Sequence, residues 1–236
     1  MKEINFYRFD KSWNTPVVYT TVIVDFPYFE DNYLQIHQTI MVLAYQIRDY
    51  FYDALLLGYN INIIPNPIKK ILVIEVSGYN TKIDKLLNEF FDNLKSLGNL
   101  EKYLNLVNLE YKDDLERYKT MDPLKYGMQN IKNILLSDYK TSKELYDSYR
   151  ELSSREYFNI LGKILDSKKI YYQYGNFRRK IGNENTFNIN ITRNNMLKDL
   201  EVKHPNKKEK NSGLFILYNL GEYSVKNDVY SKLLNS

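Results

Sequence analysis

The sequence predicts an α+β fold in which an antiparallel sheet is covered by helices on one face. Three observations predict it: β-branched and aromatic runs typical of strands, segments with apolar residues every three or four positions, and the order of the two. That order is strand, helix, hairpin, a run of helices and a final strand. Helices packed on one face of an antiparallel sheet bury both kinds of apolar surface.

The first strand and the first helix are predicted near the N-terminus. Residues 17–26, VVYTTVIVDF, are β-branched and aromatic, and Pro27 ends this run. From Tyr33 to Leu55 apolar residues recur at spacings of three and four, which predicts one long amphipathic helix. Gly58 fits the position just after such a helix, where left-handed dihedral angles are needed.

A hairpin and a second helix are predicted next. Residues 59–64 and 71–76 are predicted strands, and the connection between them contains two prolines, which a central strand would exclude. Thr81 and the three residues after it resemble a capping box. The helix that this box begins is expected to run as far as Gly98.

The middle of the chain is predicted to be helical before one last strand. Residues 100–119 form one candidate helix, and Asp122-Pro123 begins another with proline in its first turn. Residues 141–144 and 153–156 are two further capping boxes, each before an amphipathic segment. Residues 169–174 are the predicted final strand.

Composition divides the chain into three parts. Residues 1–178 form the predicted α+β domain, and residues 179–211 are polar and basic, which predicts a linker. Residues 212–236 contain the strand-like run SGLFILYNL, predicted to be either the truncated start of a second such domain or a strand that pairs with a partner. An apolar strand at an exposed edge promotes aggregation, so partner contacts are expected at Leu214, Phe215, Ile216, Leu217 and Tyr218.

Composition and charge exclude several classes of function. The chain has no cysteine, which removes disulfides, thiolate zinc sites and thiol nucleophiles. The net charge of +4 is mild and spread along the chain, so nucleic acid is not an expected partner. No signal peptide or membrane-spanning run is visible, and a cytoplasmic protein is expected. The 23 tyrosines, with abundant Asn, Lys and Ile, are typical of an AT-rich coding sequence.

One dense basic patch is formed by Lys203, Lys207, Lys208 and Lys210. Clustered lysines attract phosphate or acidic partners. Glu209 interrupts the run, however, and no aromatic residue is interleaved for base stacking. The favoured interpretation is a linker between domains, and the alternative is a site for an acidic partner.

Several stretches resemble the insulinase or pitrilysin type of zinc metallopeptidases, the inverzincins. They are DFPYFEDN, YDALLLGYNINI, IEVSGYNTK, MDPLKYGMQNIKNILL and YGNF, in that order. The resemblance is to the non-catalytic third domain of an insulin-degrading-enzyme-like protein, and residues 212–234 resemble the start of the fourth. It implies one repeat of an α+β domain in a protein whose two halves enclose a peptide chamber.

Catalysis in that family needs an H-x-x-E-H helix, whose histidines hold zinc and whose glutamate activates water. This chain contains only His37 and His204, and His37 is followed by Gln-Thr-Ile-Met. We therefore predict no catalytic residue, no metal ligand and no cofactor. His37 is expected on a helix face and His204 in solvent.

Two functions remain open. The first is a non-catalytic domain of an insulinase-type peptidase, acting as a structural or substrate-chamber half with a zinc-bearing partner. The second is a shortened, catalytically inactive homologue used as a protein-binding module on another assembly. Both predict a protein partner, and the missing zinc ligands argue against a free-standing enzyme.

Overall fold

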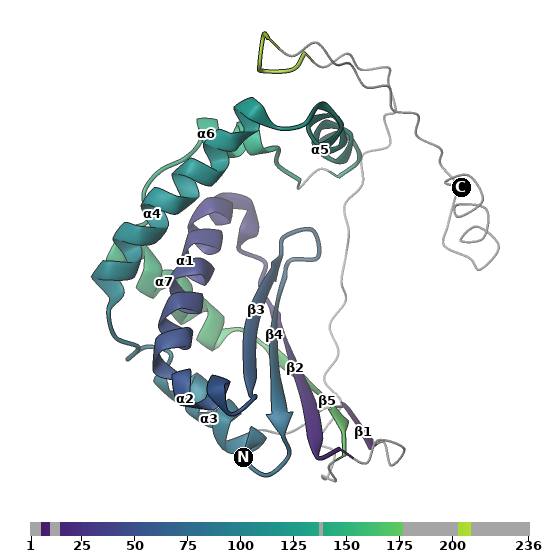
Figure 1. The fold of residues 1–236 in the computed structure, drawn as a ribbon, viewed down its shortest axis with the longest axis vertical. Coiled ribbons are helices and arrows are strands. Elements are labelled where there is room, and N and C mark those ends of the chain that lie inside the picture. Colours follow the sequence, from purple (N-terminus) through teal and green to yellow (C-terminus); the bar gives the residue numbers. More distant parts are fainter. Residues whose placement is uncertain (1–5, 10–14, 137–138, 177–202, 209–236) are drawn as a thin grey trace, which may run out of the picture.

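A computed structural model describes residues 6–9, 15–136, 139–176 and 203–208 of the chain. Five strands form one sheet in the order β1-β5-β2-β4-β3, and the helices gather on one of its faces (Figure 1). The α+β prediction is confirmed. The elements are β1 (Phe6–Phe9), β2 (Val17–Asp25), α1 (Phe29–Tyr50), α2 (Tyr52–Leu56), β3 (Asn60–Asn66), β4 (Ile71–Tyr79), α3 (Ile83–Asn93), α4 (Leu100–Glu116), the 3-10 helix η1 (Arg117–Thr120), α5 (Pro123–Leu135), α6 (Ser142–Asp147), α7 (Ser154–Asp166) and β5 (Lys169–Gly175).

The sheet is antiparallel in its four main strands. In the centre, Val22 on β2 pairs with Ile74 on β4 and with Tyr171 on β5. The strand β1, which was not predicted, pairs in parallel with β5 at the edge. Its sequence, FYRF, is too short to show an alternating pattern.

The core lies between the sheet and the helices. Successive residues of a strand point to opposite faces, and every second residue of β2 is almost fully buried against the helices. The helical layer contributes the other half of the core through α1, α3, α4 and α7. Its largest fully buried side chains include Tyr157, Phe90, Ile36, Leu43, Ile83, Leu87 and Leu161.

The predicted helix from Tyr33 to Leu55 is two helices. The chain leaves helical geometry at Phe51 (φ −100°, ψ 20°), and α2 begins one residue later. The Phe51 ring is 5% exposed and lies 6.4 Å from the Phe90 ring, centroid to centroid. The break therefore places an aromatic ring in the core at the point where the helix turns, which periodicity alone does not reveal.

Two glycines explain two of the motifs that carry the family resemblance. Gly58 follows α2 with φ +87°, as predicted for the residue after a helix. Gly78, with φ +151°, lies under the Tyr59 ring, where an added Cβ would come within 2.2 Å of that ring. The Tyr59 ring lies against Gly78, and the Tyr79 ring lies near Gly58. The two Gly-Tyr pairs therefore contact each other where β3 begins and β4 ends.

The predicted helix caps are partly confirmed. Thr141 and Ser153 form complete capping boxes, and Asp122 accepts hydrogen bonds from two backbone N–H groups of α5. The box predicted at Thr81 is wrong, because α3 begins after Lys82 and has no side-chain cap.

The predicted end of α3 at Gly98 is also wrong, since the helix stops at Asn93. Gln46, buried on α1, donates hydrogen bonds to the carbonyls of Leu97 (3.0 Å) and Gly98 (2.9 Å). In a helix that continued to Gly98, these carbonyls would point along the helix axis and would not be available to Gln46 in this way. The left-handed residue in this connection is Asn99, with φ +62°.

The predicted boundaries between domains stay predictions. The described part of the domain ends at Asn176. Of the predicted linker the structure describes only residues 203–208, and the predicted third part, residues 212–236, lies outside the described residues.

Candidate functional site

The face of the sheet away from the helices carries a mixed surface, here called the open face. It is formed by Tyr19, Thr21, Ile23, Ile64, Val73 and Glu75. Tyr19 and Ile64 are 45% and 40% exposed, and the others are partly or fully exposed. Within the described residues no helix covers this face (Figure 1).

The open face alternates apolar and polar rows. Ile23 pairs with Val73, which pairs with Ile64, so one apolar row crosses three strands. In the next row Thr21 pairs with Glu75. Such rows can bind the apolar side chains and the hydrogen-bonding groups of another chain. A reaction centre would also need a nucleophile with a paired base, or a metal, and these six residues do not provide one.

His37 lies on α1, as predicted, and is half-buried. Its ring stacks on Tyr33 with centroids 4.6 Å apart, and its Nε2 atom is buried without a hydrogen-bond partner. Burial lowers the pKa of His37 to about 4, so the imidazole is neutral near neutral pH. Among the residues that the structure describes, no three His, Cys, Asp or Glu side chains come together as a metal site requires.

His204 is held against the helical layer instead of standing in solvent. Its Nδ1 accepts a hydrogen bond from the Asn206 N–H (3.2 Å). Its Nε2 therefore carries the proton, and it donates to the Met121 carbonyl (2.8 Å). The ring also meets the edge of Tyr126, with centroids 5.3 Å apart. This contact docks the segment 203–208 beside α5.

Three lysines of the predicted basic patch are described, and all three are exposed. Lys203, Lys207 and Lys208 lie in the docked segment, whereas Lys210 lies outside the described residues. Lys203 helps to line an open cavity of about 430 Å³ together with Tyr126, Asn130, Asn133, Thr141, Lys143, Glu144 and Asp147. The predicted contact residues Leu214, Phe215, Ile216, Leu217 and Tyr218 also lie outside the described residues.

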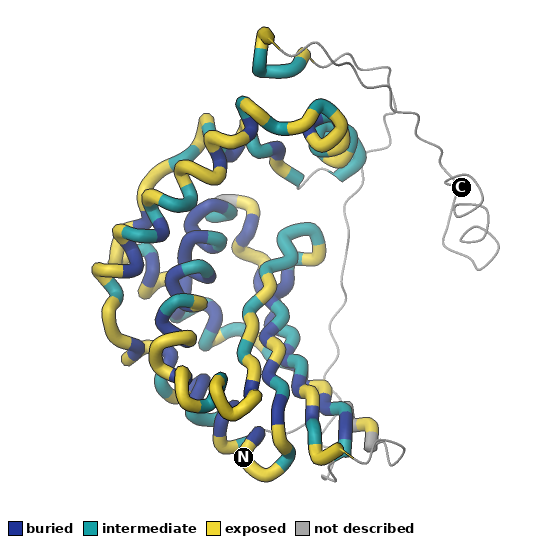
Figure 2. Tube along the Cα trace, viewed as in Figure 1, coloured by how far each residue is buried: buried dark blue, intermediate teal, exposed yellow. Residues whose placement is uncertain are grey.

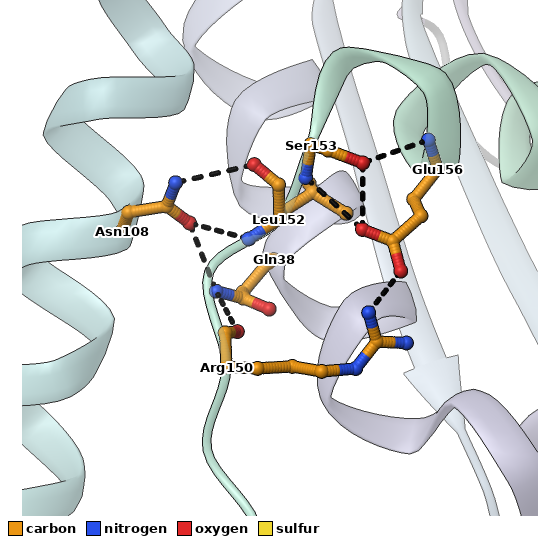
Figure 3. Close-up of polar contacts among 6 residues, drawn as sticks. All are labelled: Gln38, Asn108, Arg150, Leu152, Ser153 and Glu156. Atoms are coloured by element: carbon orange, nitrogen blue, oxygen red, sulfur yellow. Dashed lines mark hydrogen bonds and ion pairs between the residues drawn. The ribbon is translucent and has the colours of Figure 1, made fainter.

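A polar network on the helical side of the sheet joins α1, α4 and the start of α7 (Figure 3). Asn108 on α4 accepts from the Leu152 N–H (2.9 Å) and donates to the Leu152 carbonyl (3.2 Å), as a neighbouring strand would. Gln38 on α1 donates to Asn108 Oδ1 (3.0 Å) and to the Arg150 carbonyl (3.4 Å). We call these contacts the Asn108 clasp. Amides do not transfer protons at neutral pH, so the clasp is structural.

The next contacts of the same network begin α7. Ser153 accepts from the Glu156 N–H (3.3 Å), and the Glu156 carboxylate accepts from the Ser153 hydroxyl (2.7 Å) and from the Arg150 guanidinium (Figure 3). Each polar group is already used to hold the start of a helix.

Sequence reasoning did not identify the open face as a candidate site. Each of its strands was predicted, but the partners of each strand and the face covered by helices depend on the tertiary fold. The available signal was the alternation in VVYTTVIVD, where tyrosine, threonine and isoleucine alternate with buried valine and threonine.

None of the described helices is long and apolar enough to cross a lipid bilayer. This finding concerns the helices alone.

Comparison with known proteins gives one family and a set of similar folds. The family described as the middle or third domain of peptidase_M16 matches residues 5–148. No curated protein matches the sequence.

Three solved structures are similar in fold to this chain. Pitrilysin is 12% identical with a TM-score of 0.62, and the match covers 75% of this chain and 19% of that one. The periplasmic protease PqqL from Escherichia coli is 15% identical, with a TM-score of 0.56 over 73% of this chain and 20% of that one. The ferredoxin protease FusC, in complex with Arabidopsis ferredoxin, is 11% identical, with a TM-score of 0.52 over 73% and 20%. The chain thus spans about a fifth of the length of each.

Proposed function

This chain belongs to the M16 peptidase family as its middle or third domain, and on that premise we propose that it is a non-catalytic wall of a peptide chamber. In this proposal a partner chain or another domain carries the H-x-x-E-H helix, its zinc and the glutamate that activates water. The present chain supplies a surface that binds and orients the peptide.

The open face is the observation that carries this proposal. An extended peptide lying across β2 and β4 would meet the apolar row of Ile23, Val73 and Ile64 and, beside it, the polar row of Thr21 and Glu75. Binding energy from parts of a substrate distant from the reacting bond can position that bond without any reacting group nearby. A wall of this kind needs no acid, base or metal of its own.

The histidines support a non-catalytic role. His37 is neutral and stacked on Tyr33, and the Nε2 proton of His204 is used on the Met121 carbonyl. The sequence contains no third histidine. The absence of cysteine fits the reducing cytoplasm, which we propose as the location.

Native mass spectrometry of the protein isolated from its own cells, with zinc analysis of the same sample, tests the proposal. We expect a complex with a chain or domain that carries H-x-x-E-H and one zinc per complex. A zinc-free complex with an unrelated assembly would overturn it. That result would favour the second function, a shortened homologue used as a protein-binding module.

A further inference from the structure

Helix α5 differs from the other long helices in how little of it is buried. Tyr126 is its only buried residue, whereas α7, which is also 13 residues long, buries Tyr157, Ile160, Leu161 and Ile164. Figure 2 shows α5 mostly as exposed and intermediate positions at one end of the molecule. A helix of this length normally depends on packing of an apolar face for its stability.

An apolar face is nevertheless present on α5. Leu124, Met128, Ile131 and Leu135 recur at spacings of four, three and four, so they form one stripe along the helix. Leu124 is 59% exposed and Met128 is 45% exposed, while Ile131 and Leu135 are partly exposed. This is the spacing of the inward a and d positions of a coiled coil. We call these four residues the α5 stripe.

Two lysines flank the α5 stripe on the same side. Lys125 follows Leu124, and Lys132 follows Ile131, so both occupy the position that a coiled coil assigns to e. Both are exposed, and neither forms an ion pair with a carboxylate of the described residues. Lys132 lies over the Tyr139 ring at 5.9 Å. Charges at e positions select the opposite charge on a partner helix.

The cavity beside α5 carries charges of both signs. Lys143 and Lys203 line the cavity beside Tyr126, and both are exposed without an ion pair among the described residues. Two carboxylates, Glu144 and Asp147, line the same cavity, and Glu144 accepts hydrogen bonds from Thr141 and Asn133. Lys125 and Lys132 have no ion pair among the described residues, so a partner helix with carboxylates at the facing positions would complement them.

We propose that α5 docks against an amphipathic helix of another protein that has carboxylates beside its apolar seam. The seam covers the α5 stripe, and the carboxylates face Lys125 and Lys132. Because the stripe lies on α5 and not on the sheet, this docking surface is separate from the open face and does not depend on the proposed chamber function.

The test measures the binding of a defined peptide to the full chain by fluorescence anisotropy. The probe is a labelled three-heptad helical peptide with leucine at a and d and glutamate at e and g. We expect saturable binding that weakens as salt is added. Met128→Ser, and the double change Lys125→Glu with Lys132→Glu, should each weaken binding by about tenfold or more, since these residues lie at the centre and rim of the contact.

Matched controls separate this surface from general stickiness or charge. Leu109→Ser alters an α4 side chain that is 68% exposed, and Lys85→Glu with Lys95→Glu removes the same charge elsewhere. Both should leave the affinity unchanged. A second peptide with serine at a and d, and a third with lysine at e and g, should not bind, and these two tests need no change to the protein.

Several results would overturn the proposal. The serine peptide could bind as well as the leucine peptide, the α5 changes could leave binding unaltered, or no peptide could bind. Binding to phosphatidylserine vesicles that depends on Met128, without peptide binding, would assign the stripe to a membrane surface. Self-association that Met128→Ser abolishes, again without peptide binding, would assign it to a second copy of this chain.

Discussion

The two faces of the sheet use alternate residues of the same strands for different purposes. On the covered face Val18, Val22 and Val24 of β2 are fully buried beneath the helices. On the open face Tyr19 is 45% exposed, and Thr21 and Ile23 are partly exposed. The buried side chains of β2 therefore lie on one face, and its side chains on the other face remain at least partly accessible.

The largest loss of stability is expected when a side chain on the covered face is truncated, compared with a neighbouring side chain on the open face. Ile74 is fully buried on the covered face, and Ile23 is partly exposed on the open face of the neighbouring strand. Ile74→Ala should lower the free energy of unfolding by about 2–5 kcal/mol, because it leaves a cavity. Ile23→Ala should lower it by about 1 kcal/mol or less. Urea denaturation of both variants measures the difference, and equal losses would contradict the assignment of faces.

His37 on α1, in the helical layer that covers the sheet, should account for a loss of stability in acid. Burial disfavours the charged imidazole and lowers the pKa of His37 in the folded chain to about 4, whereas an unburied histidine titrates near 6.5. Between these values the unfolded chain binds a proton that the folded chain does not. The free energy of unfolding should therefore fall as the pH drops through this window, by about 1.4 kcal/mol per pH unit.

His37→Gln provides the control for this prediction. Its unfolding free energy should depend less on pH between about 6.5 and 4 than that of the unaltered protein, measured by urea denaturation at a series of pH values. Identical pH profiles would mean that His37 is not the group that titrates on unfolding.

The Asn108 clasp should matter more than a similar residue on the solvent side of α4. Asn108→Asp removes the donor to the Leu152 carbonyl, so the free energy of unfolding should fall by about 1–3 kcal/mol. Asn105→Asp introduces the same charge at an exposed position of the same helix and should have little effect. Thermal and urea denaturation compare the two, and similar losses would show that the clasp contributes nothing specific.

The smallest effect distinguishes a capping box that forms from one that does not. Ser153→Ala removes the acceptor for the Glu156 N–H and should cost about 1 kcal/mol of folding free energy. Thr81→Ala should change it by less than about 0.5 kcal/mol, since α3 has no side-chain cap. Equal losses of unfolding free energy in urea denaturation would mean that Thr81 does cap α3, as the sequence predicts.

Local chemistry explains which parts of the fold could be predicted. The boxes at Thr141 and Ser153, and proline after Asp122, depend on residues within one turn, and they form as expected. The break at Phe51 and the early end of α3 depend on distant partners, namely Phe90 and Gln46. No local pattern contains those partners.

The candidate site was harder to predict for the same reason. The absence of H-x-x-E-H follows directly from the sequence. The open face depends on the pairing of β2 with β4 and of β4 with β3. The α5 stripe is a candidate surface because the tertiary fold leaves Leu124 and Met128 exposed. A helical period predicts an apolar face but does not say whether that face is covered.

Photocrosslinking shows whether a bound peptide touches the open face. A photoreactive amino acid replaces Tyr19 on the open face or, as the matched control, Leu109 on the helical side, in the complex isolated from the cells that make it. A labelled peptide substrate of that complex is then added and irradiated. We expect the peptide to crosslink at position 19 and not at position 109. Crosslinking at position 109 alone, or equally at both, would contradict the assignment of the open face as the wall that a peptide contacts.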